Sequence, residues 1–181
     1  MAFVVMLSGS LAAIDAAPPS VVVSQVDRAQ QRIVAWAVDR YRRVGLELPP
    51  LEVHFHPSPG ACAGNSGLSL DARIDLCTGT TTIAYARATL LHEMAHAWLE
   101  QHATPELRAR FLPLLGLSTW SSRDVPWYRR GVEQAAAILA WGLGDGSLRT
   151  LAHDDDPGAL TVAFRSLTGR PPLSPEAVAT P

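Results

Sequence analysis

Two histidines and a glutamate stand together in the segment His92-Glu93-Met94-Ala95-His96, which has the pattern HExxH. On an α-helix four residues turn through about 400°, so His92 and His96 share one face, roughly 6 Å apart along the axis. Two imidazoles at that spacing can bind one zinc ion. Glu93 can then accept a proton from a water molecule at the metal. The segment therefore predicts a zinc-dependent metallopeptidase with Glu93 as general base.

The residues around the motif favour this chemistry. Burying two histidines and a carboxylate in an apolar helix is costly unless a partner such as a metal ion satisfies them. The alternative is a chance HExxH sequence with ordinary core or surface histidines, and the motif alone leaves that alternative open. The apolar neighbours are Leu90, Leu91, Met94, Ala95, Ala97, Trp98 and Leu99.

A catalytic zinc ion needs a third protein ligand. His102 has the spacing of the metzincin motif HExxHxxGxxH, but Leu99 stands where that motif has glycine. Metzincins also need a downstream Met-turn, and no methionine follows Met94. We therefore expect His102 to be an exposed residue near the end of the helix.

Glu133 is the strongest candidate for the third ligand. It lies within a predicted helix, and a carboxylate in a stripe of small apolar side chains needs a partner, which a metal ion can supply. An ion pair with Arg129 or Arg130 is the alternative. The residues that share its helical face are Ala136, Ala137, Ala140 and Trp141.

The segments His92–Leu99 and Arg130–Ala136 together resemble the gluzincins, in particular their minimal forms. The Cys-flanked hairpin and Ala140-Trp141-Gly142-Leu143 are also similar to uncharacterised exported proteins of actinobacteria. The resemblance spans about residues 51–143. It implies that His92, His96 and Glu133 hold zinc and that Glu93 activates water.

The same resemblance implies an α+β, zincin-like domain with an N-terminal helix, a small mixed sheet, an active-site helix and a Glu-bearing helix. Gluzincins often stabilise the transition state with a Tyr or His from beyond the third ligand. No residue here matches a motif for that role, and Tyr128 and His153 are candidates by chemistry alone.

Hydrophobic periodicity and capping residues predict the elements that must position these groups. The strand over 73–77 directly precedes the active-site helix, and we expect its edge to pair with an extended peptide substrate. The predicted helices cover 24–44, 83–101, a segment from Thr104 onward, 127–141 and 159–167, and the predicted strands cover 51–55, 68–70 and 73–77.

Size and charge limit the functional classes. A chain of 181 residues with 48% hydrophobic residues fits one domain, which we place at residues 20–170, followed by a Pro-rich tail at 171–181. The formal net charge is −2, so we expect a peptide or protein substrate rather than nucleic acid.

Residues 1–19 are either a secretory signal or an apolar N-terminal arm, because their apolar run lacks a preceding basic residue. The run is too short for stable membrane insertion. Cys62 and Cys77 suit a disulfide in an oxidising compartment, with two free thiols as the alternative. We therefore expect a secreted or cell-surface protein, with a cytoplasmic location as the alternative.

Overall fold

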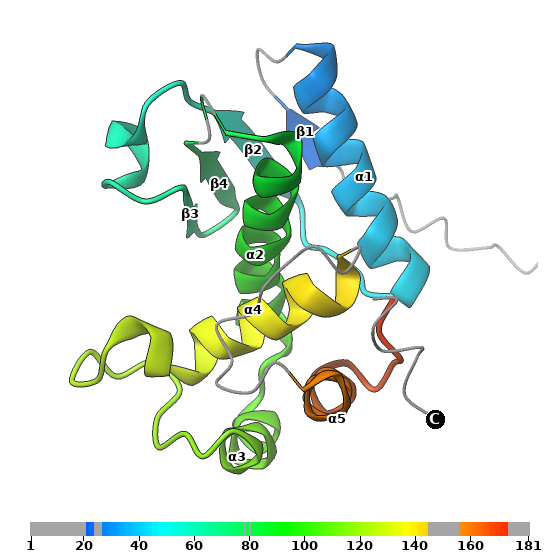
Figure 1. Cartoon of the computed structure of the whole chain (residues 1–181), viewed down its shortest axis with the longest axis vertical. Coiled ribbons are helices and arrows are strands. Elements are labelled where there is room, and N and C mark those ends of the chain that lie inside the picture. Colours follow the sequence, from blue (N-terminus) through cyan, green and yellow to red (C-terminus); the bar gives the residue numbers. More distant parts are fainter. Residues whose placement is uncertain (1–20, 24–26, 78, 80, 145–155, 174–181) are drawn as a thin grey trace, which may run out of the picture.

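The computed structural model describes residues 21–23, 27–77, 79, 81–144 and 156–173, which form an α+β structure with a small mixed sheet (Figure 1). The expected α+β class is confirmed. The strands are β1 (Val21–Val23), β2 (Leu51–Phe55), β3 (Gly67–Leu70) and β4 (Arg73–Leu76). The helices are α1 (Arg28–Val44), α2 (Ile83–His102), α3 (Pro105–Leu114), α4 (Gly131–Leu143) and α5 (Pro157–Thr168), with 3-10 turns η1 (Pro59–Cys62) and η2 (Trp127–Arg129).

The sheet has the strand order β1-β2-β4-β3, in which β1 and β4 pair parallel with β2 and β3 pairs antiparallel with β4. This order contradicts the expectation that Arg73–Leu76 offers a free edge, because β4 has a partner on both sides. The free edge next to α2 belongs to β3. Alternation of side chains predicts strands but does not reveal their lateral order, so β4 was assigned the wrong position.

The hairpin of β3 and β4 determines which backbone groups of β3 face outward. Leu70 pairs with Arg73 across a two-residue turn, and Asp71 in that turn is left-handed, with φ 52°. In an antiparallel pair, bonded and non-bonded positions alternate, so Leu68 and Leu70 bond to β4. The N–H and C=O groups of Gly67 and Ser69 therefore point away from β4, toward α2.

Helix α1 begins at Arg28, later than the predicted Ser24. Asp27 is in an extended conformation, and its side chain accepts hydrogen bonds from the N–H groups of Ala29 and Gln30, which completes a capping box. Gly45 ends the helix in the left-handed conformation, as its position after the last apolar residue predicts.

Buried contacts from α1 join it to both helices of the site. The Tyr41 hydroxyl donates to the Leu91 carbonyl of α2 at 3.1 Å. The Arg40 guanidinium donates to the carbonyls of Leu143 and Gly144, where its positive charge lies at the negative end of the α4 dipole. α1 thereby fixes the C-terminal end of α4 relative to α2.

Helix α4 begins at Gly131, so the predicted start at Trp127 is wrong. The residues after the start signal form only the 3-10 turn η2, and Arg130 is extended. The N–H groups of Gly131 and Val132 then bond to carbonyls of the preceding loop rather than continuing that turn. This shift places Glu133 in the first turn of α4, where the helix dipole favours a negative charge.

α2 runs through the middle of the molecule, and α4 crosses it with its C-terminal end toward α1 (Figure 1). Small side chains let the two helices approach closely, and Ala95, Ala135 and Ala136 are fully buried between or beside them.

Within the described part of the chain, no helix is long and apolar enough to cross a bilayer. Residues 1–19, the expected signal or N-terminal arm, lie outside the described residues. Near the start of the expected C-terminal tail, the N–H of Leu173 donates a hydrogen bond to the Gly142 carbonyl.

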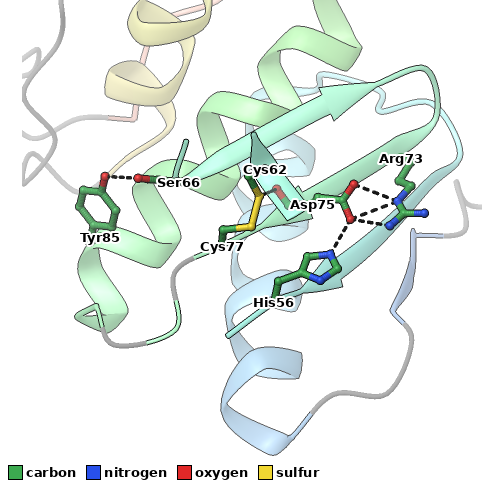
Figure 2. Close-up of a disulfide and its surroundings, with 7 residues drawn as sticks. All are labelled: His56, Cys62, Ser66, Arg73, Asp75, Cys77 and Tyr85. Atoms are coloured by element: carbon green, nitrogen blue, oxygen red, sulfur yellow. Dashed lines mark hydrogen bonds and ion pairs between the residues drawn. A yellow bond between two sulfur atoms is a disulfide. The ribbon is translucent and has the colours of Figure 1, made fainter. Parts of the chain in front are cut away.

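Cys62 and Cys77 form a disulfide, as the even cysteine count predicted (Figure 2). It ties η1 to the end of β4. On the outer face of the sheet, buried Asp75 accepts hydrogen bonds from Arg73 and bonds to Nε2 of His56 at 2.6 Å. Burial alone would raise the pKa of Asp75, but these two partners hold it below its ordinary value.

Candidate metal centre

Helix α2 carries His92, Glu93 and His96 on its central turns. The helix starts where the Thr82 hydroxyl accepts a hydrogen bond from the N–H of Tyr85. The apolar residues around the motif are buried, and Leu90, Leu91, Met94 and Ala95 have no exposed surface. Burial of the neighbours on both sides therefore fixes the rotation of α2 and aims the two histidines at one point.

Three side chains converge there. Nε2 of His92 lies 3.1 Å from Nε2 of His96, and Oε2 of Glu133 lies 3.5 Å from the first nitrogen and 3.4 Å from the second. Among the described His, Cys, Asp and Glu residues, this is the group whose ligand atoms come within metal-binding reach of one another. The contact between α2 and α4 thus assembles a His-His-Glu cluster from residues about 40 positions apart.

The cluster fits the dimensions of a tetrahedral zinc site. Ligand atoms about 2.0–2.1 Å from a tetrahedral ion lie roughly 3.3 Å from one another. The three sides of the observed triangle, 3.1, 3.4 and 3.5 Å, surround that value. Two nitrogens and one carboxylate oxygen are also donors that zinc accepts. All three residues line a cleft, so the fourth coordination position would open toward it.

The charges of the cluster are mutually stabilising. Burial raises the pKa of Glu133, but contacts with His92 and His96 outweigh it and hold that pKa at about 2. Burial disfavours the charged form of His96, yet the contact with Glu133 raises the pKa of the imidazole above its ordinary value. Glu133 is therefore anionic at neutral pH. The alternative partners Arg129 and Arg130 form no ion pair with it among the described side chains.

Glu93 lies in a different environment from Glu133. Its residue surface is only 8% exposed, and burial raises the pKa of its carboxyl group above the ordinary value. The backbone of Ser69, whose N–H is one of the outward groups of β3, lowers this pKa in part. Gly67 of β3 packs against the Glu93 side chain, since a Cβ added there would be 2.6 Å from Oε1 of Glu93. The β3 edge therefore holds the Glu93 side chain in place.

A cleft of about 890 Å³ opens over the cluster. One end is formed by β3 and Tyr85, whose hydroxyl bonds to Oγ of Ser66 at 2.6 Å (Figure 2). The other end is formed by Arg108 of α3, by Trp120 of the loop before η2 and by Trp127 of η2. Tyr85, Arg108, Trp120 and Trp127 belong to no motif in the sequence. Tyr85 has a usable signal, because it stands seven residues before His92 and so on the same face of α2.

His102 and Tyr128 lie away from the cluster. His102 stacks on the ring of Trp98 with centroids 4.3 Å apart, which agrees with the rejection of the metzincin pattern. Tyr128 is 44% exposed and does not line the cleft. His153 lies outside the described residues. Tyr128, one of the two candidates for stabilising the transition state, is thus not brought to the cleft.

Comparison of the chain with models of protein families, with curated proteins and with solved structures gives no match. The geometry of the cluster and the chemistry of its residues therefore carry the functional interpretation.

Proposed function

We propose that this protein is a zinc-dependent metallopeptidase of the minimal gluzincin type, with a zincin-like fold. The observation that carries the proposal is the triangle of His92, His96 and Glu133, which has the dimensions of a zinc site and lines an open cleft beside a buried carboxylate, Glu93. A structural zinc site is disfavoured, because closed sites use four protein ligands.

His92, His96 and Glu133 would hold the metal, and zinc in a three-ligand site supplies Lewis-acid chemistry that polarises a carbonyl and makes water more acidic. Glu93 accepts a proton from the attacking water and later delivers it to the leaving amine. Its burial suits this role, because a raised pKa brings the carboxyl group closer to the working pH. The close packing of Gly67 against Glu93 positions the carboxylate for both transfers.

The substrate in this proposal is an extended segment of a peptide or protein. β3 is an edge strand that lines the cleft, and the N–H and C=O groups of Gly67 and the C=O group of Ser69 are directed toward it. A chain laid along this edge would add a strand to the sheet through backbone hydrogen bonds. Leu70 and Tyr85 are exposed and line the same end of the cleft, where they supply apolar contacts. The disulfide is consistent with a secreted or cell-surface location.

Metal removal tests the proposal. Zinc-loaded protein is expected to cleave members of a defined mixture of unstructured peptides, to lose this activity on dialysis against a chelator, and to recover it when zinc is returned. Mass spectrometry of the products is the measurement. Cleavage that persists after the metal has been removed would rule out the zinc mechanism.

Gly67→Ala is expected to slow peptide hydrolysis about 100-fold, since a displacement of about 1 Å at a reacting group has an effect of this size. The added Cβ would lie 2.6 Å from Oε1 of Glu93 and 2.8 Å from Cγ2 of Thr89, so the general base must move. Zinc content should not change, because none of the three ligands is touched.

Gly60→Ala is the matched control, because the nearest atom to its added Cβ is Oγ of Ser58 at 4.0 Å. We would measure kcat and zinc content for both variants and for the wild type. Equal kcat values for Gly67→Ala and Gly60→Ala would show that β3 does not position Glu93.

A further inference from the structure

Arg108 is held at one end of the cleft by two contacts that leave part of its guanidinium unused. Its Nε donates to the Ala103 carbonyl at 2.8 Å. The guanidinium carbon lies 5.2 Å from the centre of the Trp120 ring, a cation–π contact. Both contacts restrict the side chain, and the terminal nitrogens retain their donors.

The charge of Arg108 has no carboxylate partner in the described part of the chain. Other arginines do: Arg73 pairs with Asp75, and Arg42 and Arg43 pair with Asp39. No ion pair within 4.0 Å joins Arg108 to a described carboxylate. Among the described residues that line the cleft, Arg108 is the one arginine.

A guanidinium that is oriented, half-buried and unpaired is suited to bind a carboxylate. Its planar fork can donate two parallel hydrogen bonds to the two oxygens of one carboxylate, and charge-assisted bonds of this kind are about twice as strong as neutral ones. Prior immobilisation by Ala103 and Trp120 lowers the entropy lost when such a partner binds.

The distance of Arg108 from the metal cluster indicates where this carboxylate belongs. Ala103, to which Nε is bonded, follows His96 by seven residues, which is about 10 Å along a helix axis. An extended peptide advances about 3.3 Å per residue. A substrate chain that passes the metal cluster would thus present to Arg108 a group about three residues from the bond to be cleaved.

We propose that Arg108 is a specificity-determining residue, which selects peptides that carry a carboxylate about three residues from the cleavage point. The inference rests on the proposed function, because it takes the occupant of the cleft to be a peptide. The carboxylate comes either from an Asp or Glu side chain or from the C-terminus of the substrate. The chemistry is the same for both, and the test separates them.

The test measures binding rather than turnover, on zinc-loaded Glu93→Gln protein, so that it does not depend on hydrolysis. The probes are short acetylated peptide amides in which one Glu is moved along the sequence, each paired with its Gln counterpart, and the same Gln peptides with a free C-terminal acid. Calorimetric titration gives the affinity of each. One carboxylate source is expected to strengthen binding by about 10- to 100-fold, the range for a hydrogen bond to a charged group.

Arg108→Gln, made in the same background, is expected to remove this preference and to leave the affinity for the uncharged peptides unchanged. Arg110→Gln is the matched control, because Arg110 is exposed on the same helix and does not line the cleft. A preference for Glu over Gln identifies a side-chain carboxylate, and a preference for acid over amide identifies the C-terminus.

Two results would overturn the proposal: equal affinities for charged and uncharged peptides, or a preference that survives Arg108→Gln. If the preference survives and the melting temperature of this variant falls, Arg108 only stabilises the end of α2. If the wild type cleaves peptides without regard to acids, the proposed function stands and the role of Arg108 fails. If acidic peptides bind through Arg108 but are never cleaved, the proposed function fails and the binding of a carboxylate by Arg108 stands.

Discussion

Glu93→Gln is expected to lower the rate of peptide hydrolysis by about 100- to 10,000-fold, the usual contribution of a general acid–base group. An amide cannot accept the proton of the attacking water at neutral pH, nor return it to the leaving amine. The side chain keeps its size and its place beside Gly67. The cluster of His92, His96 and Glu133 loses no ligand, so zinc content should stay at the wild-type value.

Glu100→Gln is the matched control for this variant. Glu100 lines the same cleft, but it is exposed and lies outside the cluster, so this change should leave the rate within about twofold of the wild type. Steady-state kinetics on one peptide, with zinc content measured on each sample, make the comparison. Equal rates for Glu93→Gln and wild type would exclude Glu93 as the base. Binding of peptides by both proteins with turnover by neither would indicate a catalytically silent binding module.

The helical parts of the site could be predicted from the sequence because their signals are local. The spacing of His92 and His96 depends only on helix geometry, and Thr82 and Gly45 mark helix ends with short-range chemistry. Glu133 could be selected because a carboxylate among small apolar residues needs a partner. Its meeting with the two histidines is consistent with that reasoning, and it required only that α2 and α4 pack together.

Features that depend on contacts between distant segments could not be predicted. The alternation of side chains in Arg73–Leu76 is the same for an internal strand and for an edge strand. Only the pairing of β4 with both β2 and β3 shows that it is internal. β1 was missed because three valines form too short a pattern. The start of α4 at Gly131 depends on hydrogen bonds to a loop more than ten residues earlier. Arg108 belongs to no sequence motif. It was singled out because none of the described carboxylates forms an ion pair with it, which only the structure reveals.

Glu133→Ala is expected to weaken zinc binding by more than about 100-fold, since even the loss of a group that only supports a metal ligand weakens binding by 10- to 100-fold. Two histidines alone leave the site with too few protein ligands for a catalytic zinc ion. The anionic charge of Glu133, whose pKa is held at about 2, is lost with the side chain. Glu47→Ala removes an exposed carboxylate that does not line the cleft, and it serves as control.

The most direct test of the zinc site is elemental analysis of wild type, Glu133→Ala and Glu47→Ala after exhaustive dialysis. We expect about one zinc ion per chain in the wild type and in Glu47→Ala, and little or none in Glu133→Ala. A wild type that binds no zinc would contradict the proposed centre and leave HExxH as a coincidence of sequence. Full zinc in Glu133→Ala would show that another residue is the third ligand.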